Sequence, residues 1–419
     1  MAASEPFPIL NTSADQLHTA AGDAPRRRRK SSVLDRIDDG KSRAAADGTQ
    51  TDAPKRLSKR RRARGLLSRF RHAMSRHNCI LPACILLTFF TLYAFNPTES
   101  NPIHRFMFLS YPMPTEPGKA QLYGKGYWDI AFVAFYTVVL TFTREFFMQE
   151  VFRPIARYAG LPRRKQPRFM EQTYTALYFG ILGPAGMYVM SKTPVWYYNT
   201  RGMYEGSPHW YQEGVVKFYY LFQAAYWAQQ AIVLVLGMEK PRKDFRELVA
   251  HHIVSLALIG CSYRFHFTYI GLAIYTTHDI SDFFLATSKT LNYLDSPIVG
   301  PYYALFMGVW IYMRHYLNLK VIFSLFTEFK TIGPYELDWA GGQFKCEMAF
   351  WITLILLSSL QALNLFWLYY IIRIAYRFVR DKHATDERSD DEGEDDEPVI
   401  EELSPKKTIE GNGYAAKAN

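Results

Sequence analysis

Cysteine is scarce in this sequence, whose 419 residues contain only four. They are Cys79, Cys84, Cys261 and Cys346. Four thiols without a C-x-x-C pair exclude a disulfide framework and a cysteine zinc site, so we expect them to be ordinary packing residues. The opening MAASEPFPILNTSADQ also lacks the basic stretch and apolar core of a secretory signal, so no cleaved leader is expected.

Charge is distributed unevenly along the chain. Residues 1–77 contain 18 Lys and Arg against 8 Asp and Glu, whereas residues 383–419 contain 4 against 12. Both ends have too few large apolar residues for a core, so we predict a disordered basic N-terminal region and a disordered acidic tail. Within the tail, Ser389 is followed by three acidic residues, which makes it a candidate site for an acid-directed kinase.

Long apolar runs lie between these ends. The mean hydropathy of −0.14 hides them because it averages a polar periphery with an apolar middle. We predict an all-α, polytopic integral membrane protein rather than a single soluble globular domain. About eight transmembrane helices are expected, at about 79–95, 128–143, 174–190, 217–237, 248–263, 267–288, 297–317 and 347–372. The runs between 248 and 317 are short, so six spans with a re-entrant pair is an alternative.

The basic charge of the loops predicts their sides. The loops after the second, fourth and last predicted spans are rich in Arg and Lys and are expected in the cytosol, together with both termini. The connections at 96–126, 191–216 and 318–346 have fewer basic residues for their length and are expected across the membrane. The basic runs before residue 77 could serve nuclear import or nucleic-acid binding, but their place beside a span favours contact with anionic lipid, and no nucleic-acid partner is predicted.

Ionisable residues occur inside the fifth and sixth predicted spans. They are His251, His252, His278, Asp279 and Asp282. Such groups cost roughly 2.5 to 3.5 kcal/mol each in a bilayer, so they should face protein or water and pair with one another. If the two spans turn near Phe265, His251 and Asp279 are each 14 residues from the turn and lie at one depth near the cytosol. The spacing of the last three predicts that they share one helix face.

A histidine beside a carboxylate gains basicity and a fixed tautomer, which suits a general base or a nucleophile. We therefore predict a catalytic cluster of His251, His252, Asp279 and Asp282. One alternative is a polar network that only joins helices, and another is a single zinc or magnesium ion held by His and Asp. The histidine spacings of di-iron membrane enzymes are absent, and we predict no metal.

The stretch around these residues resembles the ceramide synthases, the longevity-assurance family within the TLC superfamily. Four motifs follow the order and spacing of the family, and their sequences are most similar to those of fungal members. They are the HH pair at 251–252, SYRFHFTYIGLAIY at 262–275, HDISDFF at 278–284 and SKTLNYLD at 288–295. The resemblance implies a TLC catalytic domain at 165–382. Residues 78–164 would then supply the first two spans and a cytosolic loop.

The resemblance also implies a reaction. A fatty acyl group would pass from acyl-CoA to the amine of a sphingoid long-chain base in the endoplasmic reticulum membrane, giving (dihydro)ceramide and CoA. The thioester is already activated, so no cofactor is expected and acyl-CoA is a substrate. One of the two histidines would deprotonate the amine or carry the acyl group as an acyl-imidazole, and the two aspartates would orient the histidines and hold the ammonium.

Other residues are predicted to bind the substrates. His278 is one, and Lys240, Arg242 and Lys243 at the cytosolic mouth are candidates for the CoA phosphates, although topology alone also predicts positive charge there. The loop at 327–348 is expected to close the far end of a tunnel for the acyl chain. Contact with membrane lipids and a homo- or hetero-oligomer are also expected, and the resemblance to fungal members implies a small single-span subunit. The alternative function is a TLC protein that binds lipid or assists at the translocon without chemistry.

Overall fold

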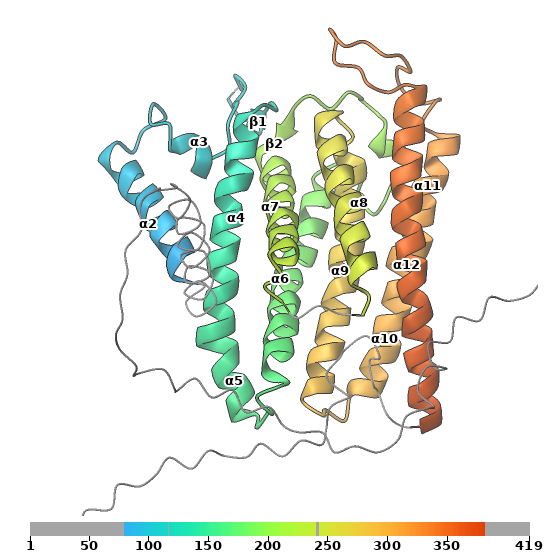
Figure 1. Ribbon diagram of the computed structural model, residues 1–419. Helices are drawn as coiled ribbons and strands as arrows, with labels where there is room; N and C mark the ends of the chain where they lie inside the picture. The colour runs from blue at the N-terminus through green and yellow to red at the C-terminus, as the bar shows by residue number, and fades with distance from the viewer. Residues whose placement is uncertain (1–78, 116, 240–242, 382–419) are drawn as a thin grey trace, which may run out of the picture. The chain divides into compact units, whose positions relative to one another are not determined.

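The computed structural model describes residues 79–115, 117–239 and 243–381. The two ends predicted to be disordered lie outside these residues, as do the candidates Ser389, Lys240 and Arg242. The described part is a bundle of long helices that run side by side (Figure 1). Its strands, β1 (Leu122–Tyr123) and β2 (Gln212–Glu213), form a short antiparallel ribbon. The helical class predicted from the apolar runs is therefore confirmed.

A helix occupies each of the eight predicted span positions. These helices are α2 (Ile80–Phe95), α4 (Trp128–Phe146), α6 (Gln166–Ser191), α7 (Gly214–Leu236), α8 (Phe245–Arg264), α9 (Thr268–Tyr293), α10 (Val299–Ile311) and α12 (Glu347–Asp381). By length and composition, the segments Trp128–Tyr158 and Glu347–Arg380 are apolar enough to cross a membrane, and α2 is a shorter apolar helix. Membrane crossing by all eight helices stays a prediction.

Shorter helical elements complete the bundle. They are α3 (His104–Met107), the π-helix η1 (Phe147–Phe152), α5 (Arg153–Tyr158), the 3-10 helix η2 (Arg201–Met203), the π-helix η3 (Tyr312–Leu317) and α11 (Asn318–Thr327). α10, η3 and α11 follow one another without a break, so the helical rod extends ten residues beyond the predicted end at 317. The wider π turn buries two successive polar residues, Arg314 and His315, and both side chains point into the bundle.

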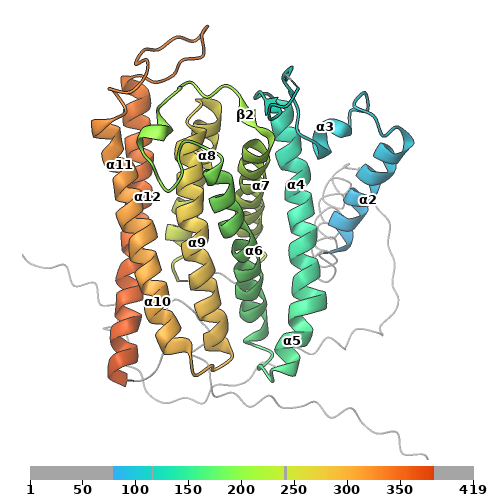
Figure 2. The ribbon, with the colours of Figure 1, turned by 180° about the vertical axis from the view of Figure 1, so that it is seen from behind.

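The connections between the long helices gather at two ends of the bundle. Those after α2, after α6 and before α12 share one end with α3, β1 and β2, while the α5–α6 and α9–α10 connections lie at the other (Figures 1 and 2). The first group contains the three connections with little basic charge for their length. The grouping agrees with the sides that the loop charges predict.

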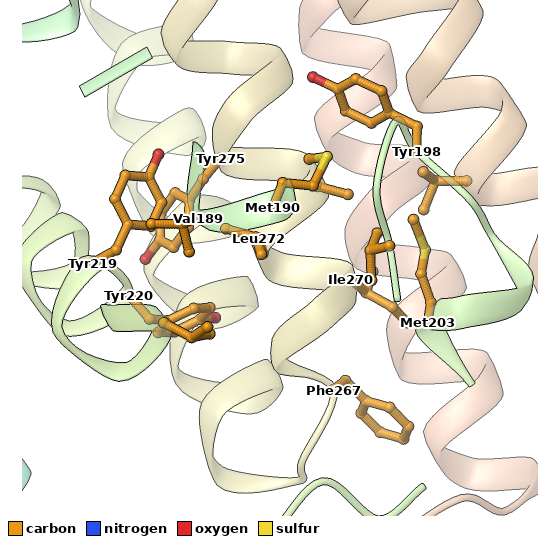
Figure 3. Packing of buried hydrophobic residues seen from close by; sticks show 14 of the residues in the cluster. Val189, Met190, Tyr198, Met203, Tyr219, Tyr220, Phe267, Ile270, Leu272 and Tyr275 are labelled. Carbon is orange, nitrogen blue, oxygen red and sulfur yellow. The ribbon is translucent and has the colours of Figure 1, made fainter. Parts of the chain in front are cut away.

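Tyrosines dominate the packing between α6, α7 and α9. Tyr219 and Tyr220 of α7 lie beside Tyr275 of α9 (Figure 3), with ring centroids 6.5 and 5.1 Å apart, respectively. Gly186 of α6 and Gly271 of α9 make room for them, since an added Cβ would lie 2.4 Å from the Tyr219 hydroxyl and 2.6 Å from that of Tyr220. Glycine at these positions therefore brings α6 and α9 against α7 and sets the place of α9.

Candidate active site

α8 carries the predicted histidine pair into the bundle. Of its 20 residues only His251 and Ser255 are buried, since residues four apart share a helix face. Ser255 Oγ lies 3.5 Å from His251 Nε2. The imidazole of His251 also packs between Trp227 of α7 and Trp367 of α12, with centroid distances of 5.4 and 5.2 Å. His251 is thus held by contacts from three helices.

Two cavities border His251. The first, which we call the polar cavity, has a volume of about 490 Å³ and lies between α6, α7, α8, α9 and α12. The second, the apolar cavity, measures about 110 Å³ and lies between α8, α9 and α12. Trp227 and His251 line both. His251 can therefore meet a molecule that has one polar and one apolar part.

The two cavities have different walls. The polar cavity is bordered by ionisable side chains from several helices, namely Glu171, Glu239, Asp244, His251, His252, Asp282, Lys289 and Arg314. The apolar cavity is aliphatic and aromatic, and it extends from His251 to the connection before α12. There it is lined by Leu337, Trp339, Phe344 and Cys346. The loop expected to close an acyl tunnel thus lies at the far end of this cavity.

Arg314 of η3 holds Asp282 at the polar cavity. Its Nη2 lies 2.6 Å from Asp282 Oδ1, its Nε donates to Ser281 Oγ at 2.6 Å, and its Nη1 donates to Asn364 Oδ1 at 3.1 Å. The guanidinium also lies 4.1 Å from the centre of the Trp310 ring. The guanidinium of Arg314 is planar and its other donors are bound to Ser281 and Asn364, so its position is fixed. The Asp282 carboxylate that it binds therefore has a defined orientation.

Hydrogen bonds occupy both ring nitrogens of His278. Its Nδ1 lies 2.9 Å from the Ile274 carbonyl oxygen, which can only accept, so Nδ1 is the donor. Its Nε2 lies 3.3 Å from Asn364 Nδ2 and accepts from that amide. The amide orientation follows from Arg314, which donates to Asn364 Oδ1. His278 is therefore a neutral partner in a network, with its ring at the apolar cavity.

Asp279 lies apart from the histidines. Its side chain is fully buried, and its Oδ2 accepts hydrogen bonds from Tyr219 Oη at 2.9 Å and from the amide of Gln223. It lines neither of the two cavities. Asp279 therefore points toward α7, because one residue turns a helix by about 100° and separates it from His278, while Asp282, three residues on, contacts Arg314 instead.

The predicted pairing of histidine with carboxylate is not formed in the described residues. His252 Nδ1 donates to the Leu248 carbonyl oxygen at 2.8 Å, and His251 contacts Ser255 instead. Asp282 and both histidines nevertheless line the same cavity. No group of three His, Cys, Asp or Glu side chains that could hold a metal ion occurs in this part of the chain.

The positive charge at the polar cavity comes from unexpected positions. Lys243 is exposed and does not line either cavity, while Lys289 and Arg314 do line the polar cavity. Arg314 could have been identified from the sequence, because inserting an arginine into a membrane costs as much free energy as inserting the histidines and aspartates that were predicted. Asn364 and Trp367 could not have been identified from the sequence, since their roles depend on which helices face α12.

Comparison with known proteins agrees with the resemblance seen in the sequence. Residues 168–373 match the TLC domain family. The chain is 47% identical over 346 residues to a sphingosine N-acyltransferase-like protein of Gibberella moniliformis, which covers 81% of this chain and 88% of that protein. It is 49% identical over 330 residues to the sphingosine N-acyltransferase lac1 of Schizosaccharomyces pombe, covering 78% and 84% of the two chains. The ceramide synthase LAG1 of Saccharomyces cerevisiae is 44% identical over 341 residues, or 81% and 82% of the two chains. The chain therefore belongs to the TLC-domain family of sphingosine N-acyltransferases, the ceramide synthases.

Proposed function

We propose that this protein is a ceramide synthase that transfers a fatty acyl group from acyl-CoA to the amine of a sphingoid long-chain base. The observation that carries this proposal is His251 at the junction of a polar and an apolar cavity. An acyl-CoA has the same division, because its thioester carbonyl joins a polar CoA arm to an apolar chain. The relatives named sphingosine N-acyltransferase and ceramide synthase support the same reaction.

The reaction forms a C–N bond and breaks the C–S bond of the thioester. The ammonium of the base gives up two protons, one of which ends on the CoA thiol while the other leaves the site. His251 can accept a proton from the ammonium, or it can attack the carbonyl and carry the acyl group until the amine arrives. Asp282, oriented by Arg314, can hold the ammonium beside it. His252 lines the polar cavity and can take the second proton.

We propose that acyl-CoA enters from the cytosol and that all eight long helices cross the endoplasmic reticulum membrane, with both termini cytosolic. The loop charges support this orientation. Lys240, Arg242 and Lys243 stay candidates for the CoA phosphates, and Asp279 for support of the site through α7. The homo- or hetero-oligomer, and the small single-span subunit implied by the fungal resemblance, also remain proposals.

Purified protein given acyl-CoA and a sphingoid base should release one CoA thiol for each ceramide formed. Thiol release is followed with a chromogenic reagent, and ceramide by mass spectrometry. Omission of either substrate should abolish ceramide formation. Binding of both substrates without any release of thiol would instead support the alternative of a TLC protein that binds lipid without chemistry.

Native cysteines can report on the acyl chain. Cys261 and Cys346 line the apolar cavity, whereas Cys79 and Cys84 lie at α2, away from it. A non-reactive thioether analogue of acyl-CoA should slow alkylation of Cys261 and Cys346 by a maleimide at least about tenfold, because the chain fills the cavity they line. Peptide mass spectrometry measures each site separately.

The two cysteines at α2 are the internal control, and their alkylation rates should not change. CoA without an acyl chain should protect none of the four thiols. Equal rates at Cys261 and Cys346 with and without the analogue would place the acyl chain elsewhere, while ceramide formation could still be intact.

A further inference from the structure

The turn between α8 and α9 borders the apolar cavity at the other end of α8 from His251. Phe265 and Phe267 line that cavity, and Phe267 is seen at the start of α9 in Figure 3. His266 between them has φ +65°, a conformation that a residue with a Cβ seldom adopts. Such a backbone persists only where its surroundings hold it. The backbone conformation of His266 therefore helps to set the direction of the two phenylalanines beside it.

Lys125 holds this turn from the connection before α4. Its Nζ donates to Thr268 Oγ1 at 2.7 Å and to the Tyr263 carbonyl oxygen at 3.2 Å, and it lies 3.3 Å from His266 Nδ1. Burial, reinforced by the charge of Lys125, lowers the pKa of His266 to about 4. His266 is therefore neutral at physiological pH, and its Nδ1 can accept from the ammonium. One side chain thus joins the end of α8, the turn and the start of α9.

Further contacts fix the position of the turn. Asp129 Oδ2 accepts from Tyr263 Oη at 2.7 Å, and its Oδ1 lies 2.7 Å from Lys217 Nζ. On the other side of the turn, the His266 ring packs against Phe344, with centroids 5.9 Å apart. Phe344 itself lines the apolar cavity. The hold on His266 therefore reaches the aromatic side chains that bound the far end of the cavity.

We propose that Lys125 is a positioning residue that determines which acyl chain lengths the enzyme accepts, by holding the 264–267 turn and with it Phe265 and Phe267 against the end of the apolar cavity. The inference rests on the proposed function. Lys125 lines neither cavity and touches no reacting atom, so it acts through the turn. Without this hold the rings can withdraw and leave room for additional methylenes.

The hold should depend on pH. Burial lowers the pKa of Lys125 to about 7, with Asp129 opposing this effect and Lys217 adding to it. Below pH 7 the ammonium has three hydrogens and a charge for its three partners, and above pH 7 the amine has fewer donors and no charge. The turn is thus held most firmly below pH 7. The charged and titratable groups that face this region are Asp129 of α4, Lys217 of α7, Tyr263 and Arg264 of α8, His266 of the turn, and His209 of the connection before α7.

The test is the product profile from an equimolar mixture of acyl-CoAs that increase by two carbons. Lys125→Met should raise the ratio of longer to shorter ceramides by at least about fourfold, which is the change in binding constant expected from burying one more methylene. Total synthesis should change less than about threefold. Lys125→Arg should keep the wild-type profile, because arginine stays charged and can still donate. The matched control is Lys192→Met, at an exposed lysine at the end of α6 that lies over the Tyr188 ring.

A pH series gives a second, independent reading on the unaltered protein. Between pH 6 and pH 8 the wild-type profile should move toward that of Lys125→Met, while Lys125→Arg stays constant. A wild-type profile in the methionine variant would overturn the proposal, and so would a flat wild-type profile over this pH range if the methionine variant does not fold. Absence of ceramide from the wild-type protein would instead count against the proposed function.

Discussion

His251→Ala should lower ceramide synthesis at least about a hundredfold, the usual contribution of a general base, and His252→Ala should reduce it severely. His251 is the basic side chain at the junction of the two cavities, and His252 lines only the polar one. The turnover number of the purified variants is measured together with thermal stability. The remote His104→Ala in α3 serves as the control, since His104 stacks on Phe108 away from both cavities.

The same variant can separate the two chemical routes. If His251 carries the acyl group, wild-type protein given acyl-CoA alone should release about one thiol per molecule and gain the acyl mass on the peptide with His251. His251→Ala would lose this burst. If His251 acts only as a base, the wild type shows no burst. Retention of more than about half of the activity by both single histidine variants would remove this pair from the catalytic centre.

Arg314→Gln is expected to have the next largest effect, with turnover reduced at least about a hundredfold and a lower thermal midpoint. The substitution leaves Asp282 as a carboxylate without its cation inside the bundle, and it releases the amide of Asn364. Loss of one partner of a buried ion pair costs about 3 to 5 kcal/mol. Enzyme kinetics and thermal unfolding in the same detergent measure the two consequences.

Two further variants distinguish stability from catalysis. Asp282→Asn combined with Arg314→Gln removes both charges, so it should recover most of the thermal stability without recovering turnover. Arg314→Lys keeps a charge for Asp282 but cannot also reach Ser281 and Asn364, so it should retain stability better than turnover. Normal turnover in Arg314→Gln at normal stability would show that Asp282 needs no orientation for the reaction.

Sequence spacing could not predict which of the two aspartates lies at the polar cavity. Asp282 and Asp279 are equally costly to insert and both follow His278 closely, so insertion cost cannot rank them. In the structure, Asp282 faces the polar cavity and Arg314, while Asp279 bonds to Tyr219 and Gln223 of α7. The charge of Asp279 is therefore not in contact with a histidine whose basicity it was expected to raise.

The seventh predicted span shows the same limit for helix length. It was predicted to end at 317, but the helical rod continues to Thr327 through a segment that also contains the polar residues Asn318, Lys320 and Ser324. Asn318 donates to Gln361 of α12, and Ser324 shares a hydrogen bond with Tyr204. Hydropathy cannot foresee that such groups find partners on segments distant in the chain.

The sequence by itself determined the helical class, the positions of the eight long helices, the histidine pair and the family, because apolar runs, ionisable residues within them and short motifs are local properties of the chain. Only the tertiary structure decided which side chains surround His251. Trp227, Arg314 and Trp367 come from α7, η3 and α12, and a small rotation of any of these helices would bring a different residue to the site. Such rotations follow from close packing between helices, which no single segment encodes.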